Sequence, residues 1–445
     1  MKGFSRTRGI ICILLISCFF ALLFGDTLSG RAVAIVVLLG LLINFIGFNI
    51  KPSGNNNPVH RLRIMYNGRE LMLVFTWTFV FHIIIGLLWK TCFNLSTGGL
   101  IAYIVSAVLL DGIVVLNGFV RIFTTSRQLG IVWRVLSALL WWLPILNIYL
   151  MVKACRIVHD EYELETEKNE LDDVRRESEI CHTKYPIVMV HGVFFRDLRF
   201  FNYWGRVPKE LIRNGAQIYY GEQHSAASVE SNARELKERI EKIVKETGCE
   251  KVNIIAHSKG GLDSRYAITH FGLDKYTASL TTVNTPHRGC SYADYLLKIA
   301  PAPFLYFISS RYNSTLKRLG ESSPDFTSAV KDLTVANCTA INEKTPDMDG
   351  VYYQSIGARM KNHRSAAFPL NLAYILVKHF SKTDNDGLVD VNSMPWGSRH
   401  IFFEPAAKRG LSHGDMIDLM REDIKGFDVR EEYVKIVKGL KDMGF

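Results

Sequence analysis

Five long apolar stretches in the first third of the chain limit its possible folds more than any other feature. Each is close to the ~20 residues that a helix needs to cross the core of a bilayer. They cover residues 9–25, 32–50, 71–89, 99–120 and 135–152. Buried helices of a globular core are a poor explanation for five such runs in succession. We therefore predict a domain of about five transmembrane helices over residues 1–156.

The basic residues of the chain are concentrated between these stretches. The whole chain has a net charge of +10, and residues 1–156 contain fourteen Lys and Arg against three acidic residues. A nucleic-acid surface needs such charge on a folded, soluble face. Basic loops between apolar stretches instead indicate the cytoplasmic side of a membrane. We therefore expect membrane association and no nucleic-acid partner.

The distribution of these basic loops predicts that the N-terminus is cytoplasmic. Five crossings then place everything after residue 152 outside the cytoplasm. Lys153 and Arg156 directly follow the fifth stretch and argue for the opposite side. The first stretch could also be a signal peptide, although no clear cleavage site follows it. The acidic, helix-forming residues 157–183 are predicted to be a solvated linker to the rest of the chain.

From residue 184 the pattern changes to short apolar strands that alternate with helices. Candidate strands are 185–190, 215–222, 251–256 and 279–284, and residues 228–248 have the apolar spacing of a helix that stops at Gly248. Continuous apolar strands separated by helices are typical of a parallel sheet with helices on both faces. We therefore predict an α/β fold for residues 184–445.

The junction Ala256-His257-Ser258-Lys259-Gly260 follows a predicted strand and precedes a predicted helix. A serine on a sharp strand-to-helix turn needs small residues two positions away on either side. The turn exposes the hydroxyl and directs the next backbone N–H toward a developing oxyanion. Ser258 is thus the candidate nucleophile, and Lys259 N–H is one candidate oxyanion donor.

The loop after the first predicted strand is the expected source of a second oxyanion donor. Val193 N–H is the candidate there, with Phe194 as the alternative. Aromatic residues follow in this loop and could line an acyl-chain pocket, although core packing explains most of them equally well. They are Phe194, Phe195, Phe200, Phe201, Tyr203 and Trp204.

A nucleophilic serine needs a histidine base and an orienting carboxylate, in the chain order Ser, Asp or Glu, His. Residues 383–391 follow an apolar, strand-like run at 372–377 and offer three aspartates, namely Asp384, Asp386 and Asp390. His413 lies in a later loop and has the right order. His379 comes too early in the chain, and His400 begins an apolar run.

Residues 185–425 resemble the bacterial triacylglycerol lipases of the Pseudomonas and Burkholderia type, which have the α/β-hydrolase fold. The matching strings, in collinear order, are VMVHGV, SVESNARELKERI, IIAHSKGGLDSRYA, LTTVNTPHRG, VYYQSIG, NDGLVDVNS and SHGDMIDL. The resemblance implies a catalytic triad of Ser258, Asp386 and His413. It also implies an oxyanion hole of the Val193 and Lys259 backbone amides.

The resemblance further implies a mobile lid within residues 290–345 and a structural calcium near the catalytic histidine. Asp415 matches one carboxylate ligand of that calcium, but Asn371 stands where a second aspartate is expected. Calcium prefers several oxygen ligands that include charge. Calcium binding is therefore expected to be weak or absent, and the chemistry needs no cofactor.

Together these features predict a membrane-anchored serine esterase or lipase that cleaves carboxylic esters of lipids. One alternative is acyl transfer, phospholipase or deacylase activity on a lipid or wall polymer, which uses the same acyl-enzyme. The other is a membrane scaffold whose hydrolase domain binds without catalysis. Labelling of the serine by a fluorophosphonate distinguishes the scaffold from the enzymes.

Overall fold

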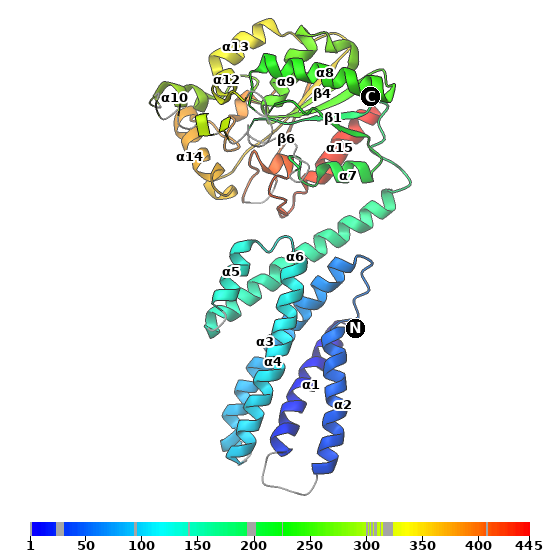
Figure 1. The fold of residues 1–445 in the computed structure, drawn as a ribbon, viewed down its shortest axis with the longest axis vertical. Helices are drawn as coiled ribbons and strands as arrows, with labels where there is room; N and C mark the ends of the chain where they lie inside the picture. The colour runs from blue at the N-terminus through cyan, green and yellow to red at the C-terminus, as the bar shows by residue number, and fades with distance from the viewer. Residues whose placement is uncertain are drawn as a thin grey trace. The chain divides into compact units, whose positions relative to one another are not determined.

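The protein, seen in a computed structural model, divides into two compact units, Met1–Leu171 and Asp172–Phe445. The division falls within the predicted linker, and each unit has a hydrophobic core of its own (Figure 1). The residues that the structure describes are 2–23, 31–92, 96–140, 143–193, 202–224, 226–299, 301, 303, 306, 309–311, 313, 314, 324–405 and 408–445.

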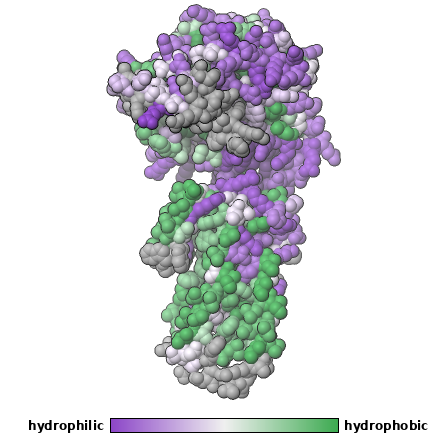
Figure 2. All heavy atoms as spheres, viewed as in Figure 1, coloured by the Kyte–Doolittle hydropathy of each residue, from purple (hydrophilic) through white to green (hydrophobic). Residues whose placement is uncertain are grey.

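Four helices form a bundle in the first unit (Figure 1). Their bounds are α1 Lys2–Leu23, α2 Arg31–Ile50, α3 His60–Cys92 and α4 Thr97–Thr125. Ile13, Leu71 and Val114 are fully buried between them. Outward-facing side chains are also apolar, for example Val36 and Leu87, which are 70% and 73% exposed. Figure 2 shows this hydrophobic surface, which is compatible with lipid around the bundle.

The first four predicted stretches fall on these four helices. Among the described residues, three apolar helical segments are long enough to cross a bilayer, namely Ser5–Leu23, His60–Trp89 and Thr97–Thr125. The apolar segment described in α2, Ala34–Ile50, is shorter.

The fifth predicted stretch, 135–152, is divided between two helices. α5 covers Ile131–Leu139, and α6 starts at Pro144 and runs to Arg175. Proline suits the first turn of a helix, where no N–H is needed, and it disfavours helix in the residue before it. The nine residues of α5 rise only about 14 Å, roughly half of the ~30 Å hydrocarbon core.

Hydrogen bonds join the turn after α4 to the middle of α6 in the first unit. The buried carboxylate of Glu161 on α6 accepts from Ser126 Oγ at 2.6 Å. It also accepts from the N–H groups of Arg127 and Gln128, at 3.0 and 3.1 Å, in the turn that follows α4. Arg61, at the start of α3, pairs with the same carboxylate at 2.6 Å. The chain therefore leaves this point after α4 and returns to it by residue 161.

The loop between α2 and α3 lies at the same end of the first unit. Ser5 Oγ of α1 donates to the carbonyl of Pro52 at 2.5 Å, and Asn55 Nδ2 donates to the hydroxyl of Tyr162 on α6 at 2.7 Å. The start of α1, the α2–α3 loop, the end of α4 and the middle of α6 thus share one end of the bundle.

The described strands of the second unit form a parallel six-stranded sheet in the order β2-β1-β3-β4-β5-β6. Their bounds are β1 Ile187–Val190, β2 Ile218–Tyr220, β3 Val252–His257, β4 Thr277–Val283, β5 Tyr352–Ala358 and β6 Arg399–Phe403. Val188 of β1 is in register with Ile254 of β3, which lies opposite Leu280 of β4. Because the strands are parallel, the loops at their carboxyl ends meet at one edge of the sheet.

Helices cover both faces of this sheet. Successive side chains of β1 point to opposite faces and are all buried, so both faces must be covered. Ile187 and Met189 pack in a cluster with α7 and α15, whereas Val188 and Val190 pack in a cluster with α8 and α9 (Figure 1). The bounds are α7 Val207–Arg213, α8 Val229–Thr247, α9 Lys259–His270 and α15 Val429–Asp442. Gly248, with φ of 72°, ends α8 as predicted. The predicted α/β-hydrolase arrangement is thus confirmed.

One predicted strand is a helix. The apolar run at 372–377 lies in α14, Leu370–Ser381, which buries Tyr374 and Val377. Six apolar residues fit a buried strand and a buried helix turn equally well, so periodicity does not separate them.

The remaining elements follow the sheet or connect its strands. They are α10 Ser291–Ile299, α12 Phe326–Asp332, α13 Val335–Lys344, and the 3-10 helices η1 Leu273–Tyr276, η2 His363–Ser365, η3 Val391–Ser393 and η4 Asp415–Ile417. α10, α12 and α13 lie in the predicted lid segment 290–345, most of whose residues between 300 and 323 lie outside the described part.

Candidate active site

Ser258 makes a one-residue bend between β3 and α9. Its φ of 55° and ψ of −131° lie in a region that residues with a side chain seldom adopt. Its N–H donates to the carbonyl of Val283, at the end of β4, at 2.9 Å. Ser258 is half-buried, whereas His257 and Lys259 on either side are buried. The bend thus presents a hydroxyl at the carboxyl edge of the sheet.

Small residues make room for this bend, as the sequence predicts. A Cβ on Gly260 would lie 2.4 Å from the carbonyl oxygen of His191. A Cβ on Gly192 would lie 2.8 Å from the Cβ of Ser258. The loop after β1 therefore lies directly against the serine, where the second oxyanion donor is expected.

Asp386 and His413 form a buried pair. The Nδ1 atom of His413 lies 2.6 Å from Asp386 Oδ2, and the His413 N–H donates to the Asp386 carbonyl at 2.8 Å. The other carboxylate oxygen accepts from the N–H groups of Leu388 and Val389, at 2.9 and 2.8 Å. These bonds fix the carboxylate and aim it at the imidazole.

The competing residues of the sequence analysis have other partners. Asp384 pairs with Arg359 and Lys378, and Asp390 accepts from Ser291 Oγ at 2.6 Å. His379 is exposed on α14 and His400 lies on β6, where its Nδ1 is 2.9 Å from Ser355 Oγ. Of the three aspartates, Asp386 is thus the one paired with His413.

His257 connects His413 to the bend. The two imidazole centroids are 4.4 Å apart, and His257 directly precedes Ser258. Burial, and secondarily the neighbouring His413, lower the pKa of His257 well below its usual range. A neutral His257 is therefore expected beside the Asp386–His413 pair.

The sequence left two interpretations of Tyr203 open, an acyl-chain pocket and core packing. In the structure Tyr203 is buried in the core. Its hydroxyl is 2.7 Å from His257 Nδ1 and accepts the N–H of Gly192 at 3.0 Å. It thereby ties the loop after β1 to the bend, a role that the sequence reasoning missed. The aromatic residues Phe194, Phe195, Phe200 and Phe201 lie outside the described residues.

Asn284 is a second residue that the sequence reasoning missed. Its Nδ2 donates to Asp386 Oδ2 at 2.6 Å, the oxygen that also faces His413. Asn284 directly follows β4. A polar residue at a strand's carboxyl end is a usable signal, because the ends of parallel strands meet at one edge.

Val193 directly follows Gly192, and Lys259 directly follows Ser258; both are buried. The Lys259 ammonium lies 2.6 Å from Asp263 Oδ1, and Asp263 Oδ2 accepts from Asn232 Nδ2 at 3.0 Å. Burial raises the pKa of Asp263, and the nearby ammonium opposes that rise. The side chain of Lys259 thus pairs with Asp263 of α9, which leaves its backbone N–H for the expected oxyanion contact.

The residues expected to hold calcium do not form an oxygen cage. Both oxygens of Asp415 contact Arg409 Nη2, at 2.8 and 3.1 Å, and Oδ2 also accepts from Ser412 N–H and Oγ at 2.7 Å. The amide oxygen of Asn371 accepts from the N–H of Leu372 at 2.7 Å. A divalent cation at Asp415 would meet a guanidinium, so these residues do not fit calcium.

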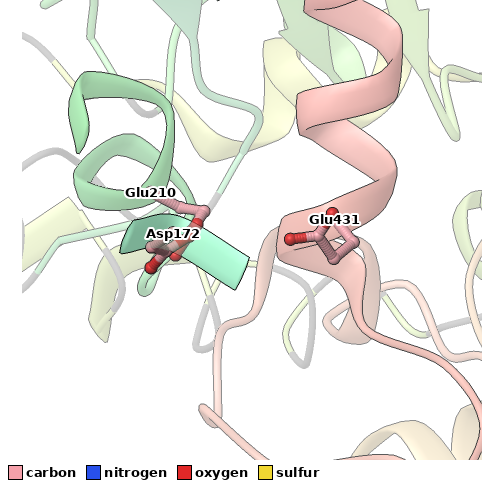
Figure 3. Close-up of side chains that lie close together, drawn as sticks. All are labelled: Asp172, Glu210 and Glu431. Carbon is pink, nitrogen blue, oxygen red and sulfur yellow. The ribbon is translucent and has the colours of Figure 1, made fainter. Parts of the chain in front are cut away.

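One acidic group in the described residues has ligand atoms close enough for a metal, within 4.8 Å of one another. It consists of Asp172 on α6, Glu210 on α7 and Glu431 on α15 (Figure 3). Arg213 already pairs with Asp172, and Arg175 pairs with Glu431 at 2.7 Å. These ion pairs fasten the end of α6 within the second unit.

A nucleophile bend at the edge of a parallel sheet, with a buried Asp-His pair beside it, defines the class of serine α/β hydrolases. Within this class, residues 184–283 match the family model of class 2 lipases.

Three curated relatives are triacylglycerol lipases. That of Pseudarthrobacter phenanthrenivorans is 32% identical over 177 residues, which cover 37% of this chain and 54% of the relative. That of Burkholderia plantarii is also 32% identical over 177 residues, with coverages of 37% and 49%. That of Pseudomonas fragi is 26% identical over 301 residues, with coverages of 59% and 98%.

These matches confirm the predicted resemblance: the chain is related to the bacterial triacylglycerol lipases. It spans about half the length of the first two relatives. The residues that match the family model, 184–283, lie in the second unit.

Proposed function

We propose that the protein is a membrane-anchored serine hydrolase that cleaves carboxylic esters of lipids. Ser258 Oγ attacks the ester carbonyl carbon while His413 takes the hydroxyl proton. The bond to the leaving alcohol then breaks, and His413 returns the proton to that alcohol. Water hydrolyses the acyl-enzyme by the same steps and regenerates the serine.

The observation that carries this proposal is the Asp386–His413 pair beside the Ser258 bend. Asp386 fixes the imidazole tautomer with Nδ1 toward the carboxylate, which leaves Nε2 for the serine proton. The N–H groups of Val193 and Lys259 stabilise the tetrahedral oxyanion. The relatedness to triacylglycerol lipases supports an acyl ester as substrate.

The test uses the full-length protein in detergent and a fluorophosphonate probe that labels activated serines. We expect labelling of the wild type, and none of Ser258→Ala or His413→Ala. Ser178→Ala changes an exposed serine of the same unit and keeps full labelling. A wild type that stays unlabelled contradicts the proposal and favours the scaffold alternative.

Product analysis with a lipid ester separates hydrolysis from transfer. With water alone as acceptor, a hydrolase releases free fatty acid. Retention of the acyl group on an added alcohol in preference to water would instead identify an acyltransferase. Strict preference for acetyl esters over long-chain esters would contradict a lipase.

We further propose that the hydrolase unit lies on the cytoplasmic side, which revises the extracytoplasmic position expected from five crossings. The α5–α6 segment leaves the end of α4 and returns to it at Glu161, and α5 is too short to cross. This supports four crossings, by α1 to α4. An even number brings the chain back to the side of the basic N-terminal loops, which is cytoplasmic by the positive-inside rule. Lys153 and Arg156 agree with this side.

A further inference from the structure

We propose that Arg409 is a positioning residue that holds the His413 loop, and that its guanidinium takes the place of the calcium ion implied by the resemblance to the bacterial lipases. The inference deepens the proposed function and rests on it. It follows from the contacts of one side chain that the sequence analysis did not single out.

Backbone hydrogen bonds on both sides of Gly410 anchor the loop that carries His413. The carbonyl of Arg409 accepts the N–H of Lys361 at 3.3 Å, and Leu411 N–H donates to the carbonyl of Arg359 at 2.7 Å. Gly410 between them has a φ of 72°, and its Cβ position is only 2.5 Å from the Lys361 nitrogen. The start of the loop is therefore pinned to the segment after β5.

The far side of the loop is held by the Arg409 side chain. Its Nη2 binds both oxygens of Asp415, two residues after His413, at 2.8 and 3.1 Å. Its Nε donates to the carbonyl of Ser365 at 2.5 Å, and its Nη1 pairs with Glu422 at 3.1 Å. The planar guanidinium thus joins three separate segments through fixed N–H directions.

The partners of Arg409 are two carboxylates and a backbone carbonyl, which is the oxygen chemistry that a calcium ion takes. Here a monovalent cation, covalently attached to the loop, already occupies these oxygens. Asp415 is buried, and Ser412 N–H and Oγ complete the hydrogen bonds of its Oδ2 atom. The charge of Asp415 is therefore already paired with that of Arg409.

Two consequences can be measured on the full-length protein in detergent. The ester-hydrolysis rate and the melting temperature of the wild type stay unchanged in EGTA and in millimolar calcium chloride. Arg409→Ala lowers kcat by about a hundredfold, because a misplaced base costs that much, while KM changes little. Added guanidinium ion restores a substantial part of the lost kcat.

Arg359→Met is the matched control. Arg359 is similarly exposed, 34% against 27% for Arg409, and pairs with Asp384 and Glu404 rather than with Asp415. We expect this variant to keep kcat and to show no response to guanidinium ion. Arg409→Lys keeps the charge but not the three-way contact, so an intermediate kcat is expected.

Loss of activity or of thermal stability in EGTA, restored by calcium, would overturn the proposal even if Arg409→Ala fails to fold. A folded Arg409→Ala protein with normal kcat would also overturn it. The proposed function fails in a different way, because the wild type then neither takes up the fluorophosphonate nor hydrolyses esters.

Discussion

The carboxylate of Asp386 is oriented by hydrogen bonds from a few individual residues. Backbone N–H groups hold one of its oxygens, and Asn284 and His413 share the other. The two backbone bonds fix its position. The bond from Asn284 sets which way the second oxygen faces.

Asn284→Ala is therefore expected to lower kcat about tenfold with little change in KM. A hydrogen bond to a charged group contributes roughly 1.5–3 kcal/mol, and part of this is lost from the orientation of His413. Steady-state kinetics on a soluble ester measure the effect. The control is Asn169→Ala, because the Asn169 side chain donates to the carbonyl of Glu165 on its own helix α6. Unchanged kcat would mean that the backbone N–H groups alone orient Asp386.

His287 gives a pH dependence of stability that is separate from catalysis. Burial, and then Arg265, lower its pKa well below its usual range, and its Nε2 lies 2.9 Å from Thr282 Oγ1. The unfolded chain binds a proton near pH 6.5 while the native His287 stays neutral. Stability is therefore retained above about pH 6.5 and falls as the pH drops below it.

The measurement is the melting temperature between pH 7.5 and pH 5.5, values chosen to bracket the unperturbed imidazole pKa of about 6.5. The wild type is expected to lose stability toward the lower value, and His287→Gln to lose less. Equal losses in the two proteins would assign the pH dependence to other groups.

At the scale of elements, α6 fixes the turn after α4 through a single carboxylate. Glu161 is 2% exposed and accepts from four donors, including Arg61. Removing it takes an acceptor from Ser126 Oγ, from two backbone N–H groups and from the partly buried Arg61 guanidinium.

Glu161→Ala is expected to destabilise the first unit by about 3–5 kcal/mol. Glu163→Ala is the matched control, because Glu163 lies on the same helix, is 59% exposed and contacts His159 at 3.2 Å. Thermal unfolding in detergent compares the two. A similar small effect of both substitutions would show that the turn after α4 does not depend on Glu161.

Helices and strands were predictable from the sequence where the apolar pattern and the order along the chain fit a single arrangement. The strands before Gly192 and Ser258 are apolar on both faces, and parallel packing then placed Ser258 and His413 at one edge. The run at 372–377 was too short to distinguish helix from strand. The partners of Asn284 and Arg409 lie far away in sequence, so their roles needed the three-dimensional structure.

The membrane topology belongs to the whole molecule. A continuous apolar stretch over 135–152 has the composition of a crossing. The break before Pro144 and the bonds of Glu161 support our proposal that the chain returns to the side from which it started. Composition reports how apolar a segment is. The contacts at its two ends decide whether it crosses.

External protease tests this topology. In intact cells we expect the hydrolase unit to resist digestion, whereas inverted membrane vesicles should expose it. A cleavage site inserted between α1 and α2 is the positive control, because that connection is predicted to face outward. Digestion of the hydrolase unit in intact cells, with membranes otherwise sealed, would restore the five-crossing topology.

The backbone conformation of Ser258 implies a trade-off between thermal stability and catalytic activity. A side chain at φ 55° and ψ −131° is disfavoured by about 1–3 kcal/mol, a penalty that glycine does not have. Ser258→Gly should therefore melt at a higher temperature than the wild type while losing all turnover. A variant that is more stable but inactive would show that the wild type loses thermal stability by placing a serine hydroxyl at this position. A melting temperature equal to or below that of the wild type would show that the serine backbone is not strained.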